Sequence, residues 1–253
     1  MVLAYSATKG LAAMTLAVAH SRGWLDYEER VSRYWPEFAQ QGKEKTTVRQ
    51  LVGHQAGLFA INERVDRRVV ADPDRLAVVL ARQKPAWEPG ARQAYHAISL
   101  GFYQGELRRR VDPRHRTLGQ FFQEEIASPL GLDCYIRLPE SIPNSRLATL
   151  TQPSPVARLL GFPIRLFLAG INPRSNIHRA FLNPGSEVVR DPHLIYARNL
   201  EVPSGGGVGT ARAIARAYSA FATEGRELAL GPRPCERWRL QRSRRPRAST
   251  TNA

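Results

Sequence analysis

Residues 6–22 combine strong helix signals with almost no polar face. Ser6 is a favourable N-cap residue and Gly23 a favourable residue for ending a helix. After Gly10 the segment contains mainly Leu, Met, Val and Ala. A helix that is apolar all round is usually buried inside a domain. We therefore expect residues 6–22 to form a central helix covered on several sides.

Capping and turn residues predict further helices. Short helices should follow Thr47 and Thr117, because threonine is a good N-cap residue. Proline at a first helical turn places another helix from Asp72-Pro73 to about Gln83. Further helices are expected over residues 95–110 and after the Ser-Gly-Gly-Gly-Val-Gly-Thr segment at 204–210. Residues 137–204 are rich in Pro, Asn and Ser, so we expect an irregular lid or wall there, and almost no strands along the chain.

The charge is strongly basic but is not arranged as in a nucleic-acid-binding motif. The chain carries a net charge of +15, and residues 231–253 hold seven Arg and one Glu, a net of +6, which leaves +9 for the other 230 residues. The remaining charge is scattered, without zinc-finger, RNP or helix-turn-helix spacing. We expect a domain over residues 1–230 and a basic, disordered tail over 231–253. Nucleic-acid association through the tail is the least favoured function.

The sequence does not indicate a metal site, a disulfide framework or a membrane-spanning helix. Two cysteines, Cys134 and Cys235, cannot form a disulfide framework. The six histidines and two cysteines lack metal-ligand spacing, so we predict no metal and no cofactor. No stretch approaches the ~18 to 20 apolar residues of a membrane-spanning helix. A cytoplasmic protein is the default expectation.

Ser6-Ala7-Thr8-Lys9 is the segment with the clearest chemical potential. Residues three apart share one helix face, so Lys9 can lie beside the Ser6 hydroxyl. Burial favours the neutral amine, which can accept a proton from a serine nucleophile. Two other interpretations stay open. Residues 1–19 have some features of a secretory signal, and Ser6 can be only an N-cap beside a Lys9 that extends to the surface.

Longer motifs resemble the serine β-lactamase-like family, which includes class C β-lactamases, penicillin-binding peptidases and related esterases. The resemblance covers about residues 3–229 and starts with YSATKGLAAMTLAVAHSRGWLDYEERVSRYWPEF. It continues through LVGHQAGL (51–58), WEPG (87–90) with Tyr95-His96-Ala97, SPLGLD (128–133) and GGGVGTARAIARAYSAFATEG (205–225). The resemblance implies an α+β, transpeptidase-like fold with no metal.

The same resemblance implies roles for individual residues. Ser6 would be the acylated nucleophile, Lys9 its proton acceptor and Tyr95 the tyrosine that passes the proton to the leaving group. His96, Gly205 and Gly206 would border the substrate. His54 is expected to be structural, with its ring tying a turn to nearby backbone. Ala97 stands where the family often has an Asn that binds the amide side chain of β-lactams, which favours an esterase.

The family's third motif, Lys-Thr-Gly or His/Trp-x-Gly, is absent from the sequence. We therefore expect a chain truncated at both ends, mostly the helical part of the fold, with most of the antiparallel sheet missing. Loss of that sheet would remove an oxyanion-hole donor and expose an apolar face to a partner, a second copy or a chaperone.

The sequence thus predicts a serine hydrolase that transfers acyl groups from a small-molecule ester or amide, with activity impaired by truncation. An inactive remnant, or a binding module on the same scaffold, is the alternative.

Overall fold

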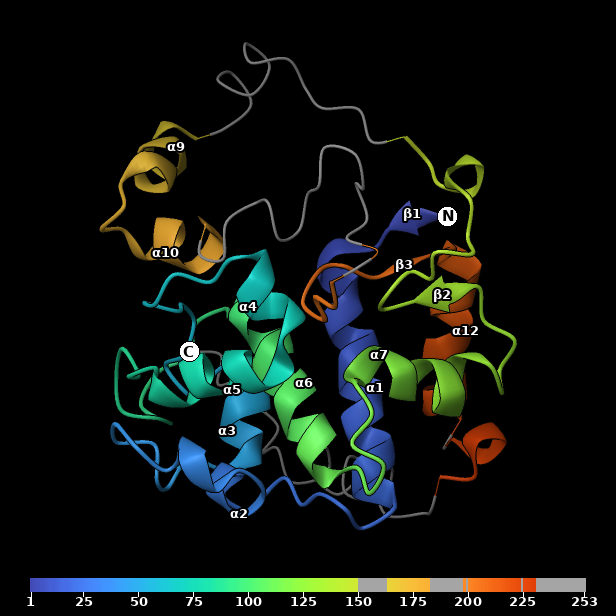
Figure 1. Cartoon of the computed structure of the whole chain (residues 1–253), viewed down its shortest axis with the longest axis horizontal. Coiled ribbons are helices and arrows are strands. Elements are labelled where there is room, and N and C mark those ends of the chain that lie inside the picture. The colour runs from blue at the N-terminus through green and yellow to red at the C-terminus, as the bar shows by residue number, and fades with distance from the viewer. Residues whose placement is uncertain (150–162, 183–197, 199, 224, 231–253) are drawn as a thin grey trace, which may run out of the picture.

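Helix α1 (Thr8–Ser21) runs through the middle of the molecule, as the sequence predicts (Figure 1). This computed structural model describes residues 1–149, 163–182, 198, 200–223 and 225–230. The predicted tail at 231–253 lies outside that part of the chain. Leu11, Leu16 and Val18 of α1 are at most 1% exposed. The helix is enclosed by α6 (Ser99–Val111), α7 (Leu118–Phe122) and α12 (Ala211–Ala222).

The other helical elements surround this centre. The α-helices are α2 (Val31–Tyr34), α3 (Val48–Val52), α4 (Arg67–Ala71), α5 (Pro73–Arg82), α9 (Ile164–Ile171) and α10 (Asn176–Leu182). Short 3-10 helices are η1 (Tyr5–Ala7), η2 (Pro36–Phe38), η4 (Asn144–Arg146) and η5 (Arg226–Leu228), and η3 (Gln123–Ala127) is a π-helix.

Two large apolar clusters meet at α1. The first lies between α1, α5 and α6 and contains the buried aromatic residues Trp35, Phe38 and Tyr103. The second lies between α1, α7 and α12 and contains Phe121 and Phe122. Because α1 contributes side chains to both clusters, it needs apolar residues around nearly its whole circumference.

A small antiparallel sheet joins three distant parts of the chain. Strands β1 (Val2–Leu3), β3 (Val208–Gly209) and β2 (Cys134–Tyr135) pair in the order β1-β3-β2. Leu3 lies opposite Val208, and Cys134 lies opposite Gly209. The fold is therefore helix-rich with a three-stranded sheet. This sheet brings the first residues of the chain beside residues 207–209 and so positions the start of α1.

Several local predictions are confirmed. Thr47 and Thr117 each form a capping box, in which the threonine hydroxyl and a glutamine side chain satisfy backbone N–H groups. Asp72 caps α5, which begins at Pro73 and ends at Arg82. Gly23 takes a positive φ of 74° directly after the end of α1.

Other predictions are corrected. Ser6 is not an N-cap, because it lies within η1 and the N-cap residue of α1 is Ala7. The helix expected from residue 95 begins only at Ser99, because residues 95–96 have no regular secondary structure and residues 97–98 form a bend. The segment expected to be irregular contains the helices α9 and α10. Both were missed because they are short, with eight and seven residues, and lie in a segment rich in Pro, Asn and Ser.

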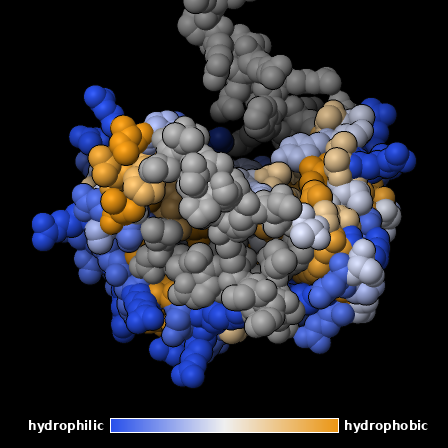
Figure 2. Space-filling view, turned by 90° about the horizontal axis from the view of Figure 1, so that it is seen from above, coloured by the Kyte–Doolittle hydropathy of each residue, from blue (hydrophilic) through white to orange (hydrophobic). Residues whose placement is uncertain are grey.

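Exposed apolar side chains gather mainly on these two helices. Most of the large ones lie on α9 and α10: Ile164, Leu166, Phe167, Leu168, Ile171, Ile177 and Phe181. Figure 2 looks from the top of Figure 1 and shows apolar surface on the side where α9 lies. We expected such surface beside the sheet, where the structure places fewer of these residues, such as Val2.

Candidate active site

Ser6 lies in the turn between β1 and α1, with the side chain exposed. The residue before it, Tyr5, has a φ of 45°, which is uncommon for a residue other than glycine. The Thr8 hydroxyl donates to the Tyr5 carbonyl at 2.6 Å and accepts the Gly207 N–H at 3.0 Å. The surrounding hydrogen bonds therefore hold a strained turn, and such strain is concentrated at functional sites.

Lys9 extends from the first turn of α1 into a buried position and is 9% exposed. Its Nζ atom lies 3.2 Å from the Ser6 Oγ atom. The same nitrogen lies 2.6 Å from the Ala97 carbonyl oxygen and 2.8 Å from the Ser204 carbonyl oxygen. Residues from three regions of the sequence thus surround one amine.

The two carbonyl groups limit how the Lys9 amine can be arranged. A carbonyl oxygen only accepts hydrogen bonds, so Ala97 and Ser204 each require an N–H from Nζ. A neutral amine has two N–H groups and one lone pair. When both N–H groups point at the carbonyls, the lone pair is left for the Ser6 hydroxyl. Burial lowers the pKa of Lys9, and hydrogen bonding with Tyr95 opposes this effect.

Tyr95 lies on the open side of the Lys9 amine. The Nζ atom is 4.9 Å from the centre of the Tyr95 ring, and the tyrosine is 48% exposed. The other neighbour of this ring is His54, with ring centres 5.2 Å apart. Burial, followed by the charge of Lys9, lowers the pKa of His54. Lys9 therefore contacts both Ser6, which is three residues away in the sequence, and Tyr95, which is far from both.

His54 and His96 support the turn that carries Tyr95. The His54 Nδ1 atom accepts the His96 backbone N–H at 2.9 Å, so the His54 ring ties this turn to neighbouring backbone as expected. The His96 ring is 0% exposed, and burial lowers its pKa to about 4. Its Nε2 atom accepts the Leu58 N–H at 3.0 Å, and its Nδ1 atom lies 2.7 Å from the Ala94 carbonyl oxygen. Both ring nitrogens are thus engaged by backbone groups, and the expectation that His96 borders the substrate stays a prediction.

Gly205 and Gly206 lie close to the turn that holds Ser6, but their N–H groups point away from it. Both N–H groups donate to the Val202 carbonyl, at 3.0 and 2.8 Å. A Cβ atom on Gly205 would lie 3.9 Å from the Tyr5 carbonyl carbon. These glycines therefore place backbone beside Ser6 without directing their N–H groups at it.

Sequence reasoning missed Ser204, which fixes one of the Lys9 carbonyl partners. The Ser204 Oγ atom donates to the Ile98 carbonyl at 2.5 Å and accepts the Gly101 N–H at 2.6 Å. A Cβ atom on Gly101 would lie 2.3 Å from the Ser204 nitrogen, so only glycine permits this contact. The glycine inside an otherwise helical segment was the available signal, because such a residue often marks a close approach.

No group of three or more potential metal ligands occurs in the described part of the chain. Within the same residues, no helix is both long and apolar enough to cross a membrane.

Comparisons with known proteins show which family the chain belongs to. A family model described as Beta-lactamase matches residues 1–253. The esterase/beta-lactamase LipL of Mycobacterium tuberculosis is 32% identical over 231 residues, which is 88% of this chain and 51% of that protein.

The chain is also similar to solved structures. A family VIII carboxylesterase is 39% identical with a TM-score of 0.70, covering 86% of this chain and 54% of that one. EstA from Arthrobacter nitroguajacolicus is 32% identical with a TM-score of 0.73, covering 85% of this chain and 55% of that one. The chain thus spans about half the length of the relatives it matches.

Proposed function

Because the chain belongs to the beta-lactamase family, we propose that it is a serine hydrolase that transfers the acyl group of a small-molecule ester or amide through Ser6. Relatives of the chain include a carboxylesterase and an esterase/beta-lactamase. These relatives support the reaction class, and they do not specify which acyl group is transferred. In this proposal Ser6 is the nucleophile, Lys9 the general base and Tyr95 a proton relay.

The arrangement of the Lys9 amine carries the proposal. Two backbone carbonyls occupy its N–H groups, and the third direction leads to Ser6 Oγ at 3.2 Å. A serine hydroxyl needs an adjacent base to become a strong nucleophile. The lowered Lys9 pKa increases the fraction of neutral amine at a given pH.

The reaction then follows from these positions. Ser6 Oγ attacks the substrate carbonyl carbon while its proton moves to Lys9 Nζ. The tetrahedral intermediate collapses when the leaving group departs with a proton delivered through Tyr95, which leaves Ser6 acylated. Water attacks the acyl group, loses a proton to the same base and releases the acid, so that Ser6 is regenerated.

Ala97 favours esters over β-lactams as substrates. Its carbonyl holds Lys9, and its methyl group is 3% exposed. The family resemblance associates the Asn found at this position with binding of a β-lactam amide side chain. A methyl group offers no such hydrogen bond, so we propose a preference for simple esters.

The direct test is covalent labelling with a fluorophosphonate followed by mass spectrometry of the intact chain. We expect one adduct per chain, located on Ser6 by peptide mapping, and hydrolysis of a p-nitrophenyl ester that the probe inhibits. Ser6→Ala should abolish both signals. Ser128→Ala, which alters an exposed serine directly after η3, is the matched control and should keep them.

A second variant tests the relay. Tyr95→Phe keeps the ring beside His54 but removes the hydroxyl, so ester turnover should fall by about 10² or more while the fold is retained. Labelling that survives Ser6→Ala would overturn the nucleophile assignment. Absence of labelling in the folded wild-type chain would favour the binding-module alternative.

A further inference from the structure

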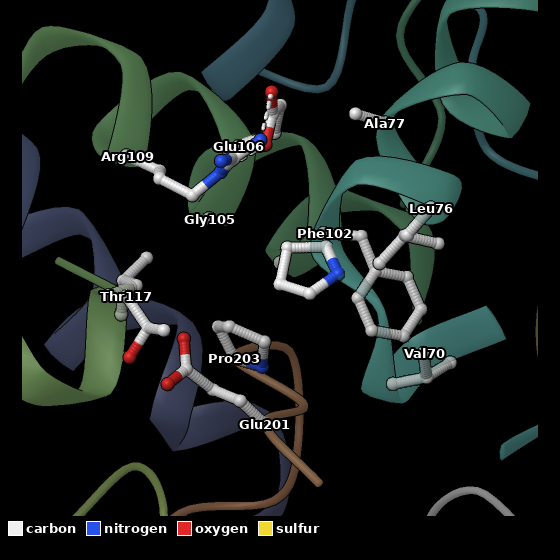
Figure 3. Close-up of a pocket in the computed structure, with 13 residues that line it drawn as sticks. Val70, Leu76, Ala77, Phe102, Gly105, Glu106, Arg109, Thr117, Glu201 and Pro203 are labelled. Carbon is white, nitrogen blue, oxygen red and sulfur yellow. Dashed lines mark hydrogen bonds and ion pairs between the residues drawn. The ribbon is translucent and has the colours of Figure 1, made fainter. Parts of the chain in front are cut away.

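The two carbonyl groups that hold the Lys9 amine are fixed in different ways. Ser204 follows Pro203, which lines a pocket of about 70 Å³ together with Val70 and Phe102 (Figure 3). The Ser204 side chain also bonds to backbone at the start of α6, at 2.5 and 2.6 Å. The position of the Ser204 carbonyl is therefore fixed by α6 and the residues around it.

The other carbonyl, that of Ala97, lies in a segment without regular secondary structure. Residues 94–97 form neither helix nor strand, and α6 begins only at Ser99. The backbone groups of this segment therefore need partners outside a helix or a sheet. Tyr95, the proposed proton relay, belongs to the same segment, so the same partners determine where the relay lies.

His54 bonds to this segment on both sides of Tyr95. The His54 carbonyl oxygen accepts the Ala94 N–H at 3.1 Å, and the His54 Nδ1 atom accepts the His96 N–H at 2.9 Å. The His54 ring also lies beside the Tyr95 ring, with ring centres 5.2 Å apart. A single residue from a distant part of the sequence thus contacts three consecutive residues of the segment.

The bond to His96 requires a neutral His54 ring. An imidazole nitrogen accepts a hydrogen bond only when it carries no proton, and both nitrogens of the charged ring are donors. Protonation of Nδ1 would therefore place two N–H groups against each other. The charged ring cannot hold the segment as the neutral ring does.

The titratable side chains that face the His54 ring are those of Lys9, from α1, and of Tyr95 and His96, from the 94–97 segment. Burial, followed by the charge of Lys9, lowers the pKa of His54, so the ring is neutral at pH 7. Burial also lowers the pKa of His96, to about 4. The bond between His54 and His96 is therefore intact at neutral pH and is lost on acidification below ~6.5, the ordinary pKa of histidine.

We propose that the neutral ring of His54 is a positioning residue for Tyr95 and for the Ala97 carbonyl, and that protonation of this ring releases the segment that carries both. The inference rests on the proposed function, because it concerns the groups that orient the Lys9 amine. Lys9 and His54 must then both be neutral for Ser6 to react. A displacement of about 1 Å in a catalytic arrangement can cost about 100-fold in rate.

The rate of fluorophosphonate labelling of the full chain, measured between pH 4.5 and 8.5, tests this proposal. The rate should fall about tenfold per pH unit where one of the two groups is protonated, and about 100-fold per unit where both are. We expect the steeper loss below ~6.5. Circular dichroism at each pH separates this loss from acid unfolding.

His54→Asn is the variant that isolates the titration. The introduced amide oxygen can accept the His96 N–H but does not titrate, and asparagine tolerates the φ of 63° found at this position. The labelling rate at pH 8 should be largely kept, and the steeper acid loss should disappear. His115→Asn is the matched control, because His115 is exposed and also has a positive φ, of 50°. It should keep the steeper loss.

His54→Leu removes the acceptor altogether and should slow labelling by about 10- to 100-fold at every pH. A steeper acid loss that persists in His54→Asn, or wild-type rates in a folded His54→Leu, would overturn the proposal. If His54→Leu does not fold, the comparison of His54→Asn with His115→Asn decides by itself. A folded wild-type chain that is not labelled at any pH would contradict the proposed function and this inference together, which distinguishes the two failures.

Discussion

In the proposed mechanism, the protonation state of the Lys9 amine decides whether Ser6 is activated. The general base must be neutral to accept the serine proton, and burial disfavours the charged form. We predict that the rate of fluorophosphonate labelling rises with pH. The midpoint of this rise should lie below ~10.4, the ordinary pKa of lysine. Labelling rates measured from neutral to alkaline pH, with circular dichroism confirming the fold at each point, check this expectation.

Lys9→Met is the companion variant. It removes the amine but keeps an unbranched side chain of similar length, so the pH-dependent rise should disappear and the rate should stay low. A midpoint at or above the ordinary lysine value, or an unchanged profile in Lys9→Met, would assign the activation of Ser6 to another group.

Only some of the groups that contact the Lys9 amine can be predicted from the sequence. The pairing of Ser6 with Lys9 follows from their spacing along a helix, and the structure places the two side chains 3.2 Å apart. The Ser204 carbonyl is 195 residues from Lys9. Backbone carbonyls carry no residue-specific signal, so neither this partner nor Ala97 can be read from the sequence as a hydrogen-bond acceptor.

At the level of elements, α6 and the 203–206 segment meet at Gly101. A Cβ atom there would lie 2.3 Å from the Ser204 nitrogen and 2.5 Å from its Oγ atom. We predict that Gly101→Ala displaces Ser204, lowers the free energy of unfolding by about 1–3 kcal/mol and slows labelling of Ser6. Urea denaturation and labelling kinetics measure the two effects.

Gly105 provides the control on the same helix. Its Cβ atom would meet only Pro203 Cγ at 3.9 Å, so Gly105→Ala should be neutral or stabilise the protein by up to about 1 kcal/mol through helix propensity. If the two variants behaved alike, the contact between Gly101 and Ser204 would not be the cause.

The elements themselves were predictable where local chemistry determines them. Thr47, Thr117 and Asp72 mark helix starts because each side chain accepts a hydrogen bond from a backbone N–H in the first turn of the helix that follows. The strands were missed because each has two residues, and their pairing depends on partners far along the chain. Helices α9 and α10 were missed because eight and seven residues are too few to establish a helical period within a segment rich in Pro and Asn.

At the level of the whole molecule, a buried charge cluster connects α6 to the second apolar cluster. Arg108 and Asp112 both have fully buried side chains, and the Arg108 guanidinium lies 3.3 Å from the centre of the Phe121 ring. The three Arg108 guanidinium nitrogens have no hydrogen-bond partner among the residues that the structure describes, whereas Asp112 accepts bonds from Arg116 at 2.7 and 3.1 Å. Burial lowers the pKa of Arg108 to about 10.

These contacts predict opposite effects for two substitutions. Arg108→Met should change the free energy of unfolding by less than about 1 kcal/mol or increase it, because Asp112 keeps its bonds from Arg116 and the substitution removes buried nitrogens that make no hydrogen bond. Asp112→Asn leaves two arginines without their shared partner and should cost about 3–5 kcal/mol. Chemical denaturation of both variants provides the comparison, and a greater loss in Arg108→Met would contradict it.

The sequence separations around Lys9 also bear on the biosynthesis of the protein. A ribosome synthesises a chain from its N-terminal end, so Ser6 and Lys9 emerge before Ala97 and Ser204, which are 88 and 195 residues from Lys9. Until residue 204 has emerged, the amine lacks one of the two carbonyls that orient it. If Ser6 acts as proposed, the order of synthesis therefore limits acylation of the nascent chain, because the amine that would activate Ser6 is not fully oriented until residue 204 has emerged.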